Sequence, residues 1–555
     1  MKKKKVLAIA MAVVVTAALS ACGMAKSGET DTTKSAGGFP GTPDQDMVTL
    51  NVVSEPTELN SMRVSDSISI CVLSHCMSGL IRLDENDVPV ADLAESWDIS
   101  DDGTVYTMNL KKDANWSNGE PVTANDYYYS WVTQMKPDTG SIFASYIYKN
   151  VKNGEEFYNG KVDESQLGLK VEDDYTLKIE WSHPITEANA LFYLSQPFFL
   201  PVNQKAYENI GDEQYAKDAE KIVTNGAYTM TEWVHDDHIT LEKSEDYYDA
   251  DAIGIPKVKL TMIGDANTAV NAFTAGEIDL CSLYSEQIDQ IEKISKDAVL
   301  SYVDGGSWYI DFNTRDENIS NVNLRKALAH SIDVQSLLDN VINDGSIAAD
   351  GMVPGVIAGA DGKSYAEVRG SLFAYDKDAA SKYLDMALEE LGKTKEELKL
   401  TFSASDTTYN QNQAAYLQQQ WKENLGLDVV LESMPVNTLI ENRNGGNYSF
   451  EVGGWGPSEN DAITFLEIFT TDNMNNNGKY SNAEYDSLIT ASMEESDPAK
   501  RQEILIQAEQ ILMDDMVVGP LYFTCTTYAV SDKIEGIART PFQYLNVRNA
   551  KFVSE

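Results

Sequence analysis

The sequence is short of basic residues. Of its 555 residues, 43 are Lys or Arg and 87 are Asp or Glu, so the formal net charge is −44. Nucleic-acid recognition needs clustered Lys and Arg, and anionic lipid headgroups repel so acidic a surface. The composition therefore excludes nucleic acid as a partner, and it excludes electrostatic binding to membranes.

Cysteine and long hydrophobic runs are also scarce. The chain has five Cys, and the four beyond the N-terminal segment (Cys71, Cys76, Cys281 and Cys525) are too few for a disulfide scaffold. We expect buried thiols, and one disulfide stays open as an alternative. No later apolar run approaches the ~20 residues that span a bilayer. With 43% hydrophobic residues the chain is not disordered, and its length predicts two or more domains.

The N-terminus has the pattern of a secretory signal. Lys2–Lys5 precede an uncharged, mostly apolar run, Val6–Ala18, and then Leu19-Ser20-Ala21-Cys22. The last four residues resemble a bacterial lipobox, which implies cleavage before Cys22 and a lipid on its thiol. An ordinary signal peptide with an incidental Cys is the alternative. We thus expect a signal peptide at 1–21 and a lipidated Cys with a flexible tether at 22–46, which holds the acidic body at the membrane.

Strand and helix patterns alternate along the rest of the chain, which indicates an α/β fold. Alternating Tyr106, Met108 and Leu110 follow Asp102-Gly103, a pair typical of hairpin turns. Four apolar stripes at helical spacing predict core helices: Leu324, Ala327, Leu328 and Ile332; Ala380, Tyr383, Leu384, Ala387 and Leu391, between Asp376 as N-cap and Gly392; Ala414, Leu417, Trp421 and Leu425; and Ile504, Ala508, Ile511 and Leu512.

Motifs of known catalytic chemistry are missing. The chain has no phosphate-binding Gly-x-x-x-x-Gly-Lys-Ser/Thr, no His-Glu-x-x-His and no Gly-x-Ser-x-Gly. His235 and His238 flank two Asp residues, which suggests either a metal site or a polar turn. Residues three apart in a strand point to opposite faces, so we favour the turn. We expect no enzyme, no cofactor and no metal.

Several longer motifs occur in one order along the chain: Leu93-Ala94-Glu95-Ser96-Trp97, Ser117-Asn118-Gly119-Glu120-Pro121-Val122-Thr123-Ala124, Asn225-Gly226-Ala227-Tyr228, Gly276-Glu277-Ile278-Asp279 and Gly454-Trp455-Gly456-Pro457. Together they resemble the solute-binding proteins of bacterial ABC importers for peptides and nickel, most closely the oligopeptide-binding proteins. The resemblance covers nearly all of residues 47–545.

This resemblance implies a two-lobed α/β clamshell of the type II periplasmic-binding-protein kind, with an extra subdomain in the first lobe. The first lobe is expected at 47–307 plus 522–555 and the second at 308–521, joined by strands near 308–313 and 521–527. The implied function is capture of oligopeptides by a monomeric, lipid-anchored receptor on the extracytoplasmic face of the cell membrane. Its implied partners are a peptide ligand and ABC permease subunits with a separate ATPase.

The resemblance also implies ligand-binding residues. Glu55 and Thr57 match a cleft-edge stretch, although this stretch also reads as a first strand that ends at Pro56. Trp308 and Tyr309 match a cleft-lining strand, with core packing as the alternative. Trp455, after two glycines, would offer the ligand a flat wall. Arg443 matches an Arg on the ligand's C-terminal side, and a surface salt bridge is its alternative.

The chain departs from the family at one position. Oligopeptide-binding members read Gly-Trp-x-x-Asp-Tyr-x-Asp/Glu-Pro, where the first Asp pairs with the ligand's amino group. Here Ser458 takes that position, Glu459 follows it, and Asp461 keeps the later acidic position. Either Glu459 binds the ammonium, or the ligand has no free amino end there.

The departure leaves other functions open. The same fold could bind a modified peptide, an oligosaccharide or a chelated metal. A secreted peptidase or glycosidase, and an adhesin or signalling receptor that has lost transport, are the more distant alternatives.

Overall fold

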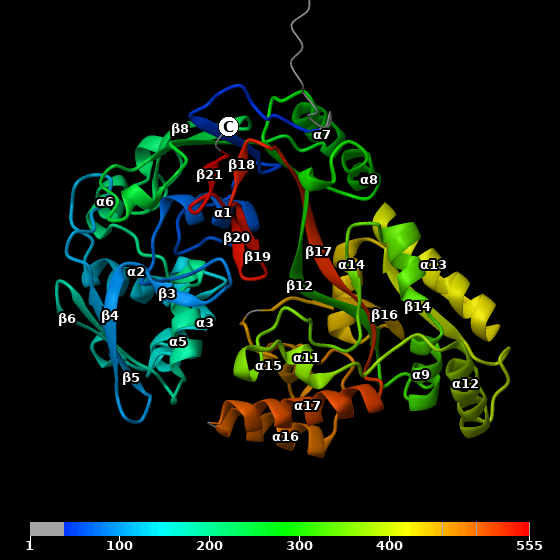
Figure 1. The fold of residues 1–555 in the computed structure, drawn as a ribbon. Coiled ribbons are helices and arrows are strands. Elements are labelled where there is room, and N and C mark those ends of the chain that lie inside the picture. The colour runs from blue at the N-terminus through cyan, green and yellow to red at the C-terminus, as the bar shows by residue number, and fades with distance from the viewer. Residues whose placement is uncertain (1–37, 458, 496, 554–555) are drawn as a thin grey trace, which may run out of the picture. The chain divides into compact units, whose positions relative to one another are not determined.

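A computed structural model describes residues 38–457, 459–495 and 497–553. The expected signal peptide, Cys22, most of the tether and Ser458 lie outside these residues. Helices and strands alternate along the described chain, which confirms the predicted α/β class (Figure 1).

One mixed sheet contains strands from both halves of the chain. Its strands pair in the order β15 (Val429–Met434), β14 (Leu400–Ser405), β16 (Phe450–Trp455), β12 (Val299–Phe312), β17 (Val518–Val530), β11 (Leu280–Leu283), β1 (Met47–Asn51), β10 (Lys257–Thr261), β9 (His238–Lys243) and β8 (Tyr228–Val234), and β13 (Ile347–Ala348) pairs with β17. β1 is parallel to β10 and β11, and β14 is parallel to β15 and β16. The long strands β12 and β17 run antiparallel side by side, with a break in register between Val303 and Ser307 (Figure 1).

A separate antiparallel sheet includes most of the Leu93–Trp97 motif of the family resemblance, in its strand β4 (Ala94–Ile99). It orders β4, β5 (Val105–Leu110), β7 (Thr176–Glu180) and β6 (Leu169–Asp173). The predicted hairpin at Asp102-Gly103 is confirmed, and Tyr106, Met108 and Leu110 are buried. Trp116 donates its indole N–H to Asp126 (3.3 Å), and Asp126 caps helix α2 (Ala124–Gln134). These residues therefore stabilise the fold.

The predicted core helices are present. They are α9 (Val322–His330), α12 (Lys377–Leu391), α13 (Thr408–Leu425) and α17 (Pro498–Asp514). Asp376 caps α12 and Gly392 ends it in the left-handed region, both as predicted. Some stripe residues are only half-buried: Tyr383 and Leu391 on α12 and Ile511 on α17 pack against the edge of the core. The stripe on α17 is partly wrong, because Ile504 is half-buried whereas Leu505 and Met513 join Ala508 and Leu512 in the core.

The remaining α-helices and β-strands lie between the elements described above, or after them, along the chain. They are α1 (Ser67–Cys76), α3 (Ala144–Tyr148), α4 (Gly154–Tyr158), α5 (Glu187–Leu194), α6 (Gln204–Ile210), α7 (Ala266–Thr274), α8 (Glu286–Glu292), α10 (Val334–Leu337), α11 (Tyr365–Arg369), α14 (Val436–Gly445), α15 (Ile463–Leu466), α16 (Ala483–Glu494), β2 (Ile81–Leu83), β3 (Pro89–Ala91), β18 (Ile534–Glu535), β19 (Ala538–Thr540), β20 (Gln543–Asn546) and β21 (Lys551–Phe552).

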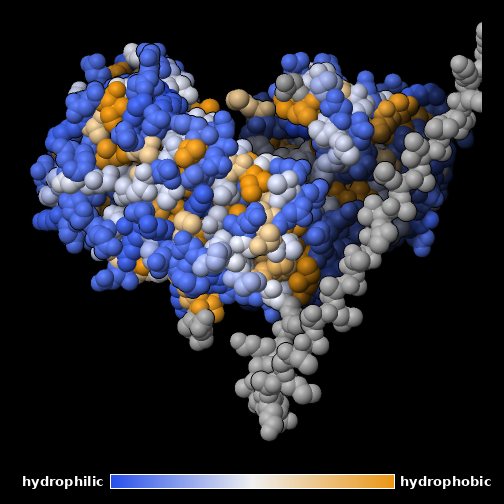
Figure 2. All heavy atoms as spheres, turned by 90° about the horizontal axis from the view of Figure 1, so that it is seen from above, coloured by the Kyte–Doolittle hydropathy of each residue, from blue (hydrophilic) through white to orange (hydrophobic). Residues whose placement is uncertain are grey.

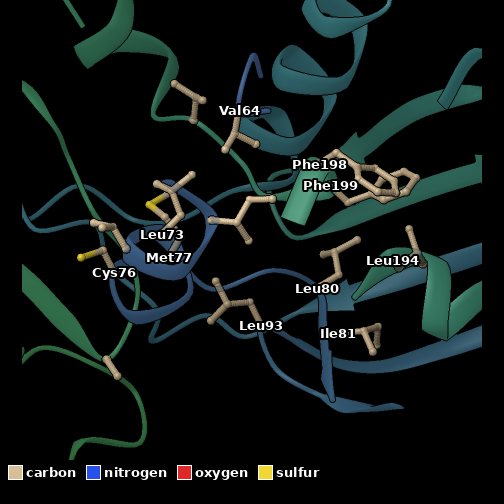
Figure 3. Packing of buried hydrophobic residues seen from close by; sticks show 14 of the residues in the cluster. Val64, Leu73, Cys76, Met77, Leu80, Ile81, Leu93, Leu194, Phe198 and Phe199 are labelled. Carbon is tan, nitrogen blue, oxygen red and sulfur yellow. The ribbon is translucent and has the colours of Figure 1, made fainter. Parts of the chain in front are cut away.

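The buried hydrophobic residues of the described chain form four clusters, which fall into two groups by the stretches of chain that they draw on. The first core group combines residues 39–299 with residues 528–550, and Figure 3 shows part of it around Leu73, Leu93 and Phe199. The second core group draws only on residues 309–522. Strands β12 and β17 pass between the two groups, since each strand contributes residues to both.

Two of the recognised motifs have structural roles. A Cβ on Gly226 would lie 2.5 Å from the backbone of Cys76 and Met77, so only glycine fits there. Asp279 is fully buried and binds the chain where the described residues begin: it accepts hydrogen bonds from the Thr42 N–H (2.7 Å), the Thr42 hydroxyl (2.8 Å) and the Thr49 N–H (2.8 Å).

The four Cys of the described chain are free thiols: Cys71, Cys76 and Cys281 are buried, and Cys525 is half-buried. Within the described ranges, no helix has the length and apolarity needed to span a membrane. Figure 2 shows one face on which hydrophilic residues dominate and hydrophobic atoms form small separate patches.

Candidate functional site

Strands β12 and β16 bring three of the predicted site residues together. Trp308 lies opposite Gly454, Tyr309 opposite Gly453, and Ser307 opposite Trp455. Directly opposed residues share a face of the sheet, so Tyr309 and Trp455 lie on one face and Trp308 on the other. The sheet therefore separates Trp308 from Tyr309 and Trp455, and the three aromatic side chains do not share one surface.

The two glycines of β16 make room for these aromatic rings. A Cβ on Gly454 would lie 3.0 Å from the Trp308 ring, and one on Gly453 would lie 3.0 Å from the Tyr309 ring. Trp308 is half-buried and stacks on Tyr522 at 6.2 Å. Tyr309 is only 6% exposed and belongs to the second core group. Ligand contact by either residue remains a prediction.

Trp455 is the last residue of β16 and is held in place. Its indole N–H donates to the Thr464 carbonyl at 2.8 Å, and its ring is half-buried against the second core group. Beside it, β16 has a backbone edge without a neighbouring strand, on which the Val452 carbonyl accepts a hydrogen bond from Arg443 (3.4 Å). Within β16, only Phe450 and Glu451 pair with β14. Residues 452–455 therefore have no neighbouring strand on that side within the described chain. Such an edge can accept an extended peptide as an added strand.

The loop after β16 places two predicted acids in different environments. Asp461 is bound to Arg501 through both oxygens, at 2.6 and 3.2 Å. The Glu459 carboxylate has no hydrogen-bond or ion-pair partner among the described residues. Burial, together with the carboxylates of Asp461 and Glu467, raises the pKa of Glu459 to about 7. Of the two acids, only Glu459 is available to a cationic ligand group.

Arg443, on α14, is paired with a buried acid. Its guanidinium donates to Glu451, whose side chain is fully buried, and also to the Val452 carbonyl at 3.4 Å. Burial raises the pKa of Glu451 to about 7, although Arg443 lowers it. Asp311 lies opposite Glu451 across the sheet and accepts a hydrogen bond from the Tyr448 hydroxyl (3.1 Å). The Arg443 charge is therefore compensated from inside the protein, and its role at the ligand's C-terminal side remains a prediction.

The segment after β1 differs from one of the two expectations for it, a first strand that ends at Pro56. β1 ends at Asn51, well before Pro56, and Val53 has φ = 66°, with the Ser54 N–H bonded to the Val52 carbonyl (2.9 Å). This γ-turn redirects the chain. Glu55 accepts hydrogen bonds from His235 and from the Asp236 N–H, and Thr57 donates to Asp66 (2.5 Å). Direct ligand contact by Glu55 and Thr57 remains a prediction.

Sequence reasoning missed a cavity of about 160 Å³ at the carboxyl ends of parallel strands β1, β10 and β11. It is lined by Asn51, Val53, Ile263, Gly264, Ala266, Ala269, Ser282 and Tyr284. Carboxyl ends of parallel strands are where open α/β sheets bind ligands. Gly264, next to Asp265 as the N-cap of α7, was the available sequence signal.

His235 and His238 belong to the tip of the β8–β9 hairpin, as predicted for a polar turn. Among the described residues, no group of three or more His, Cys, Asp or Glu is arranged to hold a metal ion.

Comparisons with a protein family, with known sequences and with solved structures all identify the same kind of protein, a bacterial solute-binding protein. Residues 88–477 match the sequence profile of bacterial extracellular solute-binding proteins, family 5. The chain is similar to the oligopeptide-binding protein OppA of Bacillus subtilis (32% identity; 99% of this chain and 100% of OppA covered) and to its dipeptide-binding protein DppE (30%; 94% of each). A solved structure of Listeria monocytogenes OppA bound to peptide has 31% identity and a TM-score of 0.72, and covers 92% of this chain and 100% of that one. The likeness establishes the two-lobed fold of the type II periplasmic binding proteins.

Proposed function

Because this chain belongs to the family 5 extracellular solute-binding proteins of bacteria, we propose that it captures oligopeptides and delivers them to an ABC permease. The main support is its full-length similarity to proteins named for oligopeptide binding, one of them solved with a peptide. The permease and its ATPase are separate chains, and the receptor acts as a monomer.

The two core groups support the proposed division into lobes at 47–307 plus 522–555 and at 308–521. β12 and β17 are then the hinge strands. A ligand that contacts both lobes shifts the population toward the closed form, which the permease recognises. The chain takes no part in chemical turnover.

The free edge of β16 is the proposed docking line for the peptide backbone. Main-chain hydrogen bonds along residues 452–455, beyond the Val452 carbonyl that Arg443 already occupies, would hold peptides of many sequences, because they do not involve the ligand's side chains. Trp455, fixed by its bond to Thr464, would cover one face of the bound strand. Gly454, which is exposed, keeps this edge accessible.

Glu459 is the proposed partner of the ligand's amino group in place of the family's Asp. Its carboxylate has no hydrogen-bond or ion-pair partner among the described residues and has already lost much of its solvent through burial, so an ion pair with an incoming ammonium would compensate for that loss. Since the pKa of Glu459 is about 7, this contribution is present above pH 7 and is lost as the pH falls and the carboxyl becomes protonated.

The test is calorimetric affinity for one peptide with a free and with an acetylated amino end, at pH 6 and pH 8. We expect the free peptide to bind at least tenfold more tightly at pH 8, an advantage that Glu459→Gln should abolish; this corresponds to about 1.4 kcal/mol. Glu441→Gln, an exposed acid on α14, is the control. Equal affinity for both peptides would refute the role of Glu459 and favour a blocked peptide or a non-peptide solute.

The lipid anchor at Cys22 is a second proposal, supported by Leu19-Ser20-Ala21-Cys22 and by a family of extracellular proteins. In a bacterial host, the wild type should fractionate with membranes and Cys22→Ser should not. Native mass spectrometry of the purified protein, with any retained ligand released and identified, tests the ligand class directly. Turnover of peptide or glycan mixtures would support an enzyme instead.

A further inference from the structure

Glu55 is held from outside its own segment by the tip of the β8–β9 hairpin. One carboxylate oxygen is 2.6 Å from His235 Nδ1, and the other accepts the Asp236 N–H at 2.8 Å. Asp236 adopts φ = 60°, so the tip turns its backbone N–H toward Glu55. Two adjacent hairpin residues thus bind both oxygens of one carboxylate that lies about 180 positions earlier in the sequence.

The other nitrogen of His235 faces a second acid. Nε2 lies 3.3 Å from Asp218, whose second oxygen binds Lys221 at 2.6 Å. The imidazole also packs on Trp233, with ring centroids 4.7 Å apart. The charged groups around the ring are therefore Glu55, Asp218 and, behind Asp218, Lys221. A doubly protonated ring donates to both carboxylates, whereas a neutral ring keeps one of these contacts.

We propose that His235 is a positioning residue, which fixes the Val53–Thr57 segment at the ligand cleft by clamping Glu55 and makes ligand affinity depend on pH. The proposal rests on the proposed function, because it needs this segment to line the cleft. It assigns Glu55 to the protein's own hairpin, so that the segment presents its backbone, and not the Glu55 charge, to a ligand.

The geometry sets the sign of the pH effect. Glu55 and then Asp218 raise the pKa of His235 above its ordinary value, so the folded protein favours the charged ring. The complete clamp is present below the ordinary His pKa and is lost as the pH rises through the raised pKa. The segment is already turned sharply at Val53, and a loosened clamp leaves it to be ordered when the ligand binds, which weakens affinity.

The hairpin tip offers a matched control. His238 contacts Asp237 (2.5 Å) and Glu232 (3.2 Å). Both acids belong to the same hairpin, so these contacts do not connect His238 to the Val53–Thr57 segment. His235→Gln and His238→Gln remove the same chemical group from positions three residues apart, but only the first breaks the clamp. Neither position belongs to the proposed docking line on β16.

The experiment measures the peptide dissociation constant of wild type, His235→Gln and His238→Gln from pH 6 to pH 9. The dissociation constant of each variant is divided by that of the wild type at the same pH, because this ratio cancels the effects of Glu459 titration and of peptide titration. For His235→Gln we expect about two- to fivefold weaker binding at pH 6 and a ratio near one at pH 9. For His238→Gln we expect a ratio near one throughout. A flat ratio for His235→Gln, or the same profile for both variants, would overturn the proposal.

A second measurement does not depend on peptide. Only five His occur in the chain, so imidazole NMR signals are resolvable, and His235→Gln assigns one of them. The pKa of His235 should fall in Glu55→Gln, and an unchanged pKa would overturn the clamp. Failure of the wild type to bind any peptide at any pH would instead refute the proposed function, and the NMR titration would still decide whether the clamp exists.

Discussion

We predict that the buried carboxylate of Asp279 holds the stretch 39–50 against the rest of the protein. This carboxylate accepts hydrogen bonds from Thr42 and Thr49, and Lys533, itself 6% exposed, lies 3.5 Å away. In Asp279→Asn, one oxygen still accepts hydrogen bonds, but an NH₂ group faces a donor and the Lys533 charge loses its partner. A buried group left unsatisfied costs about 1–3 kcal/mol, and a broken buried ion pair about 3–5 kcal/mol. Since these costs overlap, we expect about 3 kcal/mol.

The assay is hydrogen exchange of the stretch 39–50, followed by mass spectrometry. If this stretch exchanges by local opening, 3 kcal/mol corresponds to roughly 100-fold faster exchange. Glu277→Gln, an exposed acid in the same motif, should change exchange by less than about twofold. Exchange of Asp279→Asn within about threefold of wild type would refute the reasoning, since it would mean that the buried carboxylate holds nothing that an amide cannot.

Further predictions concern the close backbone contact at Gly226 and the ion pair between Arg443 and the buried Glu451. Gly226→Ala should destabilise the protein by about 2–3 kcal/mol in urea denaturation, because the added methyl would lie 2.5 Å from the backbone of Cys76 and Met77; an unchanged midpoint would contradict this contact. Because folding raises the pKa of Glu451 from 4.5 to about 7, stability conferred by its protonated form is lost as the pH rises between these values. Glu451→Gln should therefore flatten the pH dependence of stability between pH 4.5 and about pH 7, and an unchanged slope would rule Glu451 out as its source.

Local patterns in the sequence predicted the helices well, because the signal for each lies within a few residues. Asp376 and Gly392 bracket α12 as expected, since N-caps and left-handed C-caps depend on local backbone geometry. The prediction of which face of α17 is buried was partly wrong, because apolar residues lie on both sides of this helix. Only contacts with other elements determine that Leu505 and Met513, and not Ile504 and Ile511, are buried.

The site was less predictable because its contacts are distant or oppose local preference. A positive φ at Val53 is unfavourable for a β-branched residue, so no local rule predicts the γ-turn that ends β1 early. The bond between Glu55 and His235 joins one of 87 acids to a partner 180 residues away. The sequence shows two glycines before Trp455, but it does not show that the groups that approach Gly453 and Gly454 include Tyr309 and Trp308 from the neighbouring strand.

The division of the hydrophobic residues also constrains how the chain folds as it is made. The second core group draws on one continuous stretch, 309–522, and can close as soon as that stretch has emerged. The first core group needs Tyr528, Leu545 and Val547, and the Cys71 thiol donates to the Leu545 carbonyl across 474 positions. The part of the chain that is synthesised first can therefore complete its core only when these C-terminal residues are available to pack against it.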